Sequence, residues 1–179
     1  MKIKLGVVFL FLAVLISFGV FNYRSFFERQ DVDSPALQKE LNKKDVIEFF
    51  NASENVDYDQ KITPVSFDKI LETKTVYIHF WASWCGPCLN EIPELITYAK
   101  KNKSAVQFIL VSLDTSHEDL NKFLKSFPEL NDGIFVRIWD KDNVIAKKIN
   151  VDRLPMTLIL PGQGSNIKIF RSVVDWKEL

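Results

Sequence analysis

The sequence predicts an α/β fold that follows an N-terminal membrane anchor. From residue 64 onwards, short apolar runs rich in β-branched and aromatic residues alternate with amphipathic stretches, a pattern typical of strands and helices packed in layers. The 179 residues, of which 47% are hydrophobic, suffice for one globular domain and an appendage. We expect an anchor over residues 1–29, a polar linker over 30–63 and a globular domain over 64–179.

The charges and the cysteine count restrict the possible functions. The 23 Lys and Arg residues balance the 23 Asp and Glu residues. Because nucleic-acid-binding proteins usually carry a concentrated positive field, we expect no nucleic-acid partner. The chain has two cysteines, Cys85 and Cys88. Any cysteine chemistry within the chain therefore involves this one pair.

The anchor is predicted from an uncharged run of 17 residues, Leu5 to Phe21, that follows Lys2 and Lys4. This length is at the lower end of the roughly 17 to 25 residues that span a bilayer. A cleaved signal peptide has a shorter apolar region and ends in a small-x-small site, whereas bulky residues follow here. We expect an uncleaved single-pass anchor, with the two lysines in the cytoplasm and the globular domain on the extracytoplasmic, periplasmic side.

The linker is charged and polar over most of its length. A Ser-Pro pair at Ser34 is a helix start signal, and apolar residues occur between Leu37 and Phe50. One or two short helices and a solvated stalk are both compatible with this pattern. The next stretch, NASENVDYDQK, has the composition of a loop.

The first strand of the globular domain is predicted over Thr75 to Ala82, TVYIHFWA. Its continuous apolar character indicates a central strand that is buried on both faces. Both cysteines follow its C-terminal end. A helix is then predicted over residues 86–102, because apolar residues recur at helical spacing. These residues are Leu89, Ile92, Leu95, Ile96 and Ala99.

The remaining elements continue the alternation of strands and helices. We predict strands over residues 105–114, 133–140, 155–161 and 166–172. We predict helices over residues 117–127, where Ser116 and Asp119 can form a capping box, and over 142–151. The turn GQGS makes the last two strands a hairpin. The final residues, VVDWKEL, are expected to begin one more helix.

The motif Cys85-Gly86-Pro87-Cys88 places two thiols at the start of the predicted long helix. Unpaired N–H groups and the helix dipole favour a negative charge there, so we expect Cys85 to be the nucleophilic thiolate. Cys88, one turn further along, would attack the mixed disulfide and release the substrate. Pro87 suits a first-turn position, where its missing N–H costs nothing.

Two other uses of the pair are less consistent with the sequence. A structural disulfide gains stability by closing a long loop, whereas the loop between these cysteines is very short. A structural zinc site needs four ligands, and the two histidines, His79 and His117, are far apart in the chain. A redox pair is the interpretation that remains.

The stretch FWASWCGPC resembles the thioredoxin active-site motif. The Cys-x-x-Cys-x-x-Glu-x-Pro pattern, the anchor, and the helix and strand added before RLPMTLIL resemble TlpA/ResA-type membrane-anchored thiol–disulfide oxidoreductases. The resemblance covers roughly Ser66 to Ser172. It implies a thioredoxin-like fold, with a central mixed sheet flanked by helices, and a redox-active disulfide between Cys85 and Cys88.

The same resemblance implies a substrate site. Leu154 and Pro155 match a loop whose proline is cis and lies against the cysteine pair, next to a backbone edge that can bind an extended chain. Trp81 and Trp84 are expected to pack around the site, with Trp84 partly exposed for partner contact. An ordinary proline at a strand start and ordinary core aromatics are the alternatives. Gly86 and Pro87 complete the expected substrate-binding set.

Two residues at the ends of the motif are candidates for proton transfer. His79 occupies a position at which many thioredoxins have a buried carboxylate that serves the inner cysteine. Glu91 matches an acidic residue that ResA-like proteins place beside the cysteine pair. We expect Glu91 to handle protons and His79 to assist. A neutral buried histidine and a first-turn acid favoured by the helix dipole are the alternatives.

The sequence as a whole predicts an extracytoplasmic protein-disulfide oxidoreductase. The expected partners are protein disulfides or dithiols and a membrane electron donor, and no metal or organic cofactor is needed. The Gly-Pro dipeptide favours the reducing direction, because thioredoxin has a potential of about −270 mV. The resemblance makes cytochrome c maturation a candidate process. The alternatives are a copper-binding assembly factor and a non-catalytic docking module on the same fold.

Overall fold

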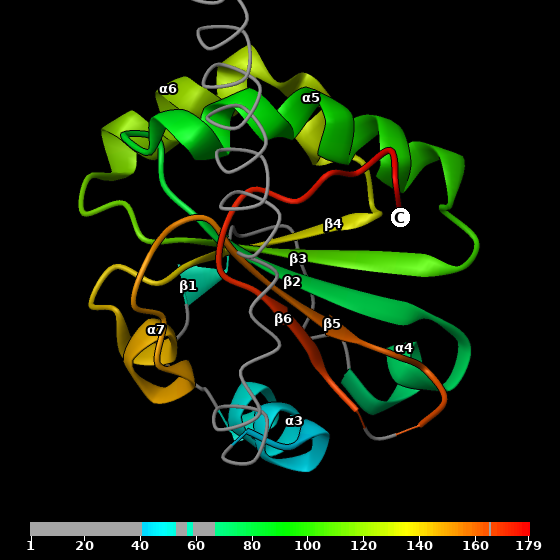
Figure 1. Ribbon diagram of the computed structural model, residues 1–179. Coiled ribbons are helices and arrows are strands. Elements are labelled where there is room, and N and C mark those ends of the chain that lie inside the picture. The colour runs from blue at the N-terminus through cyan, green and yellow to red at the C-terminus, as the bar shows by residue number, and fades with distance from the viewer. Residues whose placement is uncertain (1–40, 53–56, 59–66, 165) are drawn as a thin grey trace, which may run out of the picture. The chain divides into compact units, whose positions relative to one another are not determined.

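A computed structural model describes residues 41–52, 57–58, 67–164 and 166–179 (Figure 1). The predicted anchor, residues 1–29, and the helix start at Ser34 lie outside these residues. In the described ranges, no helix is both long enough and apolar enough to cross a membrane.

The helices are α3 (Lys43–Ala52), α4 (Phe67–Thr73), α5 (Gly86–Lys101), α6 (His117–Ser126), the 3₁₀ helix η1 (Pro128–Asn131) and α7 (Val144–Ile149). The strands are β1 (Asp57–Tyr58), β2 (Thr75–Trp81), β3 (Val106–Ser112), β4 (Phe135–Trp139), β5 (Met156–Leu160) and β6 (Lys168–Phe170).

The described strands form one mixed sheet in the order β1-β4-β3-β2-β5-β6. Strands β2, β3 and β4 are parallel, whereas β5 runs antiparallel to β2 and forms the predicted hairpin with β6. Strand β2 lies inside the sheet, with Ile78 opposite Ile109 of β3 and Leu158 of β5. Six of its seven residues are buried, so the prediction of a central strand buried on both faces is confirmed.

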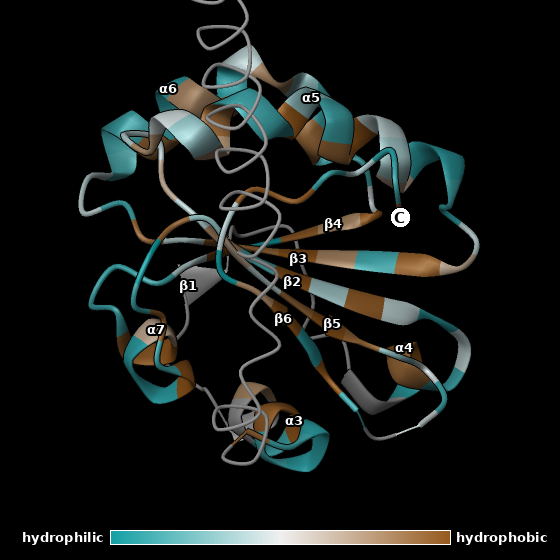
Figure 2. Ribbon diagram, viewed as in Figure 1, coloured by the Kyte–Doolittle hydropathy of each residue, from teal (hydrophilic) through white to brown (hydrophobic). Residues whose placement is uncertain are grey.

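Helices cover both faces of the sheet, which confirms the predicted α/β layers (Figure 1). One apolar cluster joins α5, α6 and η1 to one face, and a second cluster joins α3, α4 and α7 to the other. In Figure 2 the strands are largely brown, while the outer sides of the helices are teal. Each helix therefore buries an apolar stripe against the sheet, as helical periodicity requires.

Helix α5 begins shortly after β2 ends, so the cysteine pair lies at the C-terminal end of this interior strand. Cys85 is the N-cap residue, with φ −86° and ψ 96°, and its sulfur accepts a hydrogen bond from the Cys88 N–H. Pro87 occupies the first turn, and Lys100 and Lys101 lie in the last turn, where positive charge complements the helix dipole. The sequence therefore specifies where the helix carrying the redox motif begins.

Helix α3 lies within the predicted linker and packs against the globular domain. Val46 and Phe50 are buried in the cluster beneath the sheet. The Lys43 ammonium donates to the carbonyl oxygens of Pro161, Gly162 and Gly164 at 2.5, 3.2 and 3.1 Å. This described part of residues 30–63 is therefore attached to the β5–β6 connection rather than free in solvent.

Three features differ from the sequence-based expectation or were absent from it. Strand β1, which pairs with β4, arises within the stretch expected to be a loop, and α4 was not predicted. The helix expected at residues 173–179 is wrong, because that segment contains no helix. Its buried residues, Val174 and Trp176, are two positions apart, which is the spacing of extended chain rather than of a helix.

Candidate active site

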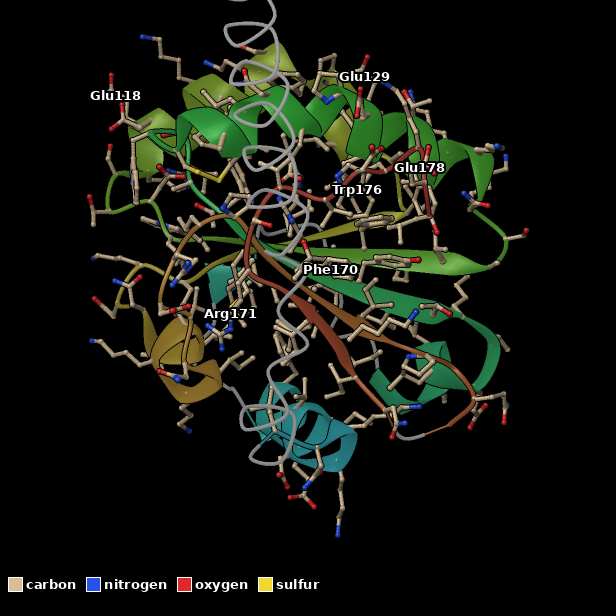
Figure 3. All side chains as sticks on the ribbon, in the orientation of Figure 1. Glu118, Glu129, Phe170, Arg171, Trp176 and Glu178 are labelled. Atoms are coloured by element: carbon tan, nitrogen blue, oxygen red, sulfur yellow. A yellow bond between two sulfur atoms is a disulfide. The ribbon has the colours of Figure 1, made fainter. Side chains whose placement is uncertain are left out.

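Cys85 and Cys88 form a disulfide at the N-terminus of α5, with their Cα atoms 5.3 Å apart (yellow bond in Figure 3). Cys88 is fully buried, and Cys85 is 6% exposed. The backbone N–H of Cys88 points at the Cys85 sulfur over 3.3 Å. In a reduced pair, this N–H and the helix dipole would favour a thiolate on Cys85. The geometry therefore suits Cys85 as the attacking sulfur and Cys88 as the resolving one.

A shallow groove of about 770 Å³ runs past the disulfide. Four predicted substrate-binding residues line it together with Cys85, namely Trp84, Gly86, Pro87 and Leu154. Trp84 is 68% exposed and is the most exposed large apolar side chain of the described residues. The opposite wall comes from the segments before α6, at the start of α7 and before β5. A chain lying in this groove would pass next to the disulfide.

The Leu154–Pro155 peptide is cis, the conformation that the family resemblance implies. Pro155 is buried and directly precedes β5, while Leu154 reaches the groove. Trp81 is buried at the end of β2 and packs on Phe123 of α6, with ring centroids 4.3 Å apart. Trp81 therefore belongs to the core behind the site, and Trp84 to its surface.

His79 and Glu91 meet in the interior behind the disulfide. The imidazole Nε2 lies 3.4 Å from the Glu91 Oε1, and neither atom has a hydrogen-bond partner among the described residues. Glu91 follows Cys88 by three positions in α5, so the two side chains share one face of the helix. The site therefore contains a buried acid–base pair on the inner cysteine's side of α5.

Burial disfavours the charged form of both members of this pair. Desolvation raises the pKa of Glu91 to about 7, partly offset by hydrogen bonds from Val174 and Trp176, which lower it. Desolvation alone lowers the pKa of His79 to about 3. Between about pH 3 and pH 7 the pair is therefore mainly a carboxylic acid beside a neutral imidazole, rather than an ion pair. Near neutral pH, Glu91 can gain or lose a proton.

The orientation of His79 is fixed from β5. Its Nδ1 and the Thr157 Oγ1 are joined by a hydrogen bond of 3.0 Å between two fully buried side chains. These residues face each other in the β2–β5 register. Thr157, two residues after Pro155, was not predicted as a site residue, because its partner is identified only by strand pairing.

Two donors that the sequence did not predict come from the end of the chain. The backbone N–H of Val174 and the indole N–H of Trp176 both donate to the Glu91 Oε2, at 3.0 and 3.3 Å. The available signal was the alternation of Val174, Asp175 and Trp176 in the tail VVDWKEL. That signal indicates an extended segment with a buried side, but not what the segment contacts.

Asp114 supports the loop that carries Trp84 and Cys85. Its buried carboxylate accepts hydrogen bonds from the Ser83 N–H, the Ser83 hydroxyl and the Ser112 hydroxyl, over 2.6 to 3.1 Å. The loop after β2 is thereby attached to the end of β3. No three His, Cys, Asp or Glu side chains in the described ranges are grouped so that they could hold a metal ion.

Comparisons with known proteins show which family this chain resembles. The model of a thioredoxin-like family matches residues 72–166. The thiol-disulfide oxidoreductase ResA of Bacillus subtilis is 30% identical over 101 residues, which are 55% of this chain and 54% of the relative. The thioredoxin-like protein YneN of Bacillus subtilis is 33% identical over 106 residues, 59% of this chain and 61% of the relative. The chain thus spans a little over half the length of these curated relatives.

A solved structure shows the same fold. It is described as a thiol:disulfide interchange protein DsbE from Chlorobium tepidum, and it matches with 25% identity and a TM-score of 0.52. The match covers 62% of this chain and 76% of that one. The family model includes β2, both cysteines, Glu91 and the cis proline, and it extends over more than half of the chain. The chain therefore belongs to the thioredoxin-like family.

Proposed function

We propose that the chain is an extracytoplasmic thiol–disulfide oxidoreductase that reduces protein disulfides through Cys85 and Cys88. The observation that carries this proposal is the disulfide at the N-terminus of α5, where it lies beside a groove with an exposed Trp84. The names of the relatives, thiol-disulfide oxidoreductase and thiol:disulfide interchange protein, support the same activity.

The proposed reaction begins with the reduced pair. The Cys85 thiolate attacks a substrate disulfide, so that a Cys85–substrate S–S bond forms, the substrate S–S bond breaks, and one substrate sulfur leaves as a thiolate. Cys88 then loses its proton and attacks the Cys85 sulfur. The Cys85–Cys88 bond forms, the mixed disulfide breaks, and the second substrate sulfur leaves. Two electrons pass from the protein to the substrate, and each leaving thiolate takes up a proton.

Glu91 is proposed to accept the Cys88 proton, with His79 assisting. Cys88 is fully buried, so its thiol has no direct route to solvent for its proton. Glu91 lies on the same helix face, and burial brings its pKa to about 7, close to a working pH. His79 stays neutral and presents Nε2 to the acid. Buried groups with perturbed pKa values beside a reactive centre often have such a role.

The reducing direction and the location are further parts of the proposal. The Gly86-Pro87 dipeptide is that of thioredoxin, whose potential of about −270 mV is reducing. The uncharged run behind Lys2 and Lys4 supports a membrane anchor and an extracytoplasmic domain. In such a compartment a membrane electron donor must return the pair to its reduced state. Cytochrome c maturation is the process that the family resemblance favours.

Reduction of insulin disulfides in the presence of dithiothreitol tests the proposed activity. We expect the full chain to accelerate the reaction, and Cys85→Ser to reduce the rate to that of dithiothreitol alone, because the variant has no nucleophilic sulfur at the groove. Equal rates for the two proteins would contradict the proposal. If the wild type proves inactive in this assay, stoichiometric retention of Cu(I) would support the copper-binding alternative instead.

A further inference from the structure

The end of the chain forms a strap, residues 173–178, that runs alongside α5 (red in Figure 1). The Trp176 side chain lies between this strap and the sheet (Figure 3). Its ring lies 5.5 Å from that of Phe108, 5.7 Å from that of Tyr98 and 5.9 Å from that of Tyr77, measured between centroids. The strap is thus held by an aromatic cluster that joins β2, β3 and α5.

Both hydrogen bonds from the strap to Glu91 end on the same oxygen atom. Val174 N–H and Trp176 Nε1–H converge on Oε2, while Oε1 accepts no hydrogen bond from a described residue and faces His79 Nε2. An oxygen that accepts two N–H donors is a poor place for a proton, because the new O–H would point at one of those donors. The proton of the neutral carboxyl therefore belongs on Oε1.

We propose that Trp176 is a positioning residue, which together with the Val174 N–H directs the Glu91 proton to Oε1 and towards His79. This inference rests on the proposed function, in which Glu91 takes the Cys88 proton. The strap holds the carboxyl so that one oxygen is a fixed acceptor and the other is the protonated atom. Without it, the carboxyl could rotate and present either oxygen.

Among the residues that the structure describes, few other ionisable groups surround this carboxyl. His79 faces it from β2, with Thr157 of β5 behind the imidazole. On α5 itself, Cys88 lies one turn before it. From the strap, Lys177 pairs with Glu94 at 2.5 Å on the exposed side of α5.

Asp175, also in the strap, is exposed, and its carboxylate accepts a hydrogen bond from the Lys177 N–H. Tyr77 of β2 contacts the indole ring of Trp176, and its hydroxyl is bonded to that of Tyr98. In the described part of the chain, the two N–H donors of the strap and His79 are therefore the polar partners placed directly at Glu91.

The test is a pH titration of the Glu91 carboxyl in the oxidised full chain, followed by its carbon-13 chemical shift. Glu91→Gln identifies the signal. In Trp176→Phe, which keeps an aromatic ring but lacks the N–H, we expect the titration midpoint to rise by roughly 1 pH unit, because the carboxylate loses a donor. In Lys177→Ala, which removes the exposed ion pair of the strap, we expect the wild-type midpoint. A midpoint in Trp176→Phe that is unchanged or lower would overturn the inference.

A second measurement needs only the wild-type protein. The Trp176 indole N–H resonance should move with pH at the same midpoint as the Glu91 carboxyl, because the hydrogen bond strengthens when its acceptor becomes charged. An indole resonance that is constant across that midpoint would overturn the inference. Neither titration requires thiol exchange, so failure of the insulin assay would contradict the proposed function alone.

Discussion

At the scale of single residues, His79 and Glu91 show how burial can make a weak acid and a weak base usable. Their ordinary pKa values are 6.5 for His79 and 4.5 for Glu91. Desolvation lowers the pKa of His79 to about 3 and raises that of Glu91 to about 7. The result is a neutral pair that needs no counter-ion in the interior. Only Glu91 then titrates near pH 7, where the proposed exchange reaction needs a proton acceptor.

The pKa of Glu91 leads to a prediction about stability. Its value in the folded protein, about 7, lies above the ordinary 4.5, so its contribution to stability is complete below pH 4.5 and is lost as the pH rises through 7. Glu91→Gln mimics the neutral acid and does not titrate. From pH 5 to pH 8 we therefore expect the wild type to lose up to ~3 kcal/mol relative to this variant.

Urea unfolding of both proteins at several pH values measures this difference. His79 is common to both, so its own titration cancels in the comparison. A difference that does not change with pH, or that changes in favour of the wild type at high pH, would show that Glu91 is already ionised in the folded protein below pH 7.

The residues of the site differ in how far the sequence could predict them. Four of them lie close together in the chain around one motif, so the local pattern identifies them as candidates: His79, Cys85, Cys88 and Glu91. The contact of His79 with Thr157 and that of Glu91 with Trp176 join positions 78 and 85 residues apart. Such contacts depend on strand register and tertiary packing, which one sequence does not reveal.

At the scale of elements, the strands were predictable because their apolar runs are continuous and bounded by polar loops. The predicted strands over residues 105–114 and 133–140 appear as β3 and β4, each shorter by a few residues. The two-residue β1 is too short to show a sequence periodicity, and it is defined by its pairing with β4. The terminal segment was wrongly expected to be a helix. Val173 and Trp176 have the three-residue spacing of one helix face, but the structure buries Val174 and Trp176 instead.

Helix α3 gives a prediction at this scale. Val46 is 1% exposed and packs in the cluster beneath the sheet. Val46→Ala should lower the free energy of unfolding of the whole domain by about 1–3 kcal/mol, through lost burial and a cavity. Lys44→Ala, which removes only an exposed pair with Glu48 on the same helix, should have little effect.

Denaturant unfolding of both α3 variants distinguishes an integral helix from an appended one. If α3 belongs to the folded domain, Val46→Ala shifts the single unfolding transition and Lys44→Ala does not. Equal midpoints for both variants and the wild type would mean that α3 contributes nothing to the stability of the domain.

At the scale of the whole molecule, the mixed sheet brings the two halves of the site together. The cysteines follow the parallel strand β2, and the cis proline precedes the antiparallel strand β5 beside it. Antiparallel pairing of these neighbours places the end of β2 next to the start of β5, which is why the disulfide and Leu154 share one groove. The family resemblance in the sequence predicted this arrangement, whereas α3 and the C-terminal strap depend on packing outside the motif.

The redox potential of the Cys85–Cys88 pair tests the central claim most directly. Equilibration of the full chain with dithiothreitol or glutathione buffers should give a reversible two-electron transition within the range of thiol–disulfide oxidoreductases, between about −280 and −120 mV, towards the reducing end if the protein is a reductase. A pair that remains fully oxidised in buffers poised below about −300 mV would be a structural disulfide. That result would contradict the assignment of a working redox couple.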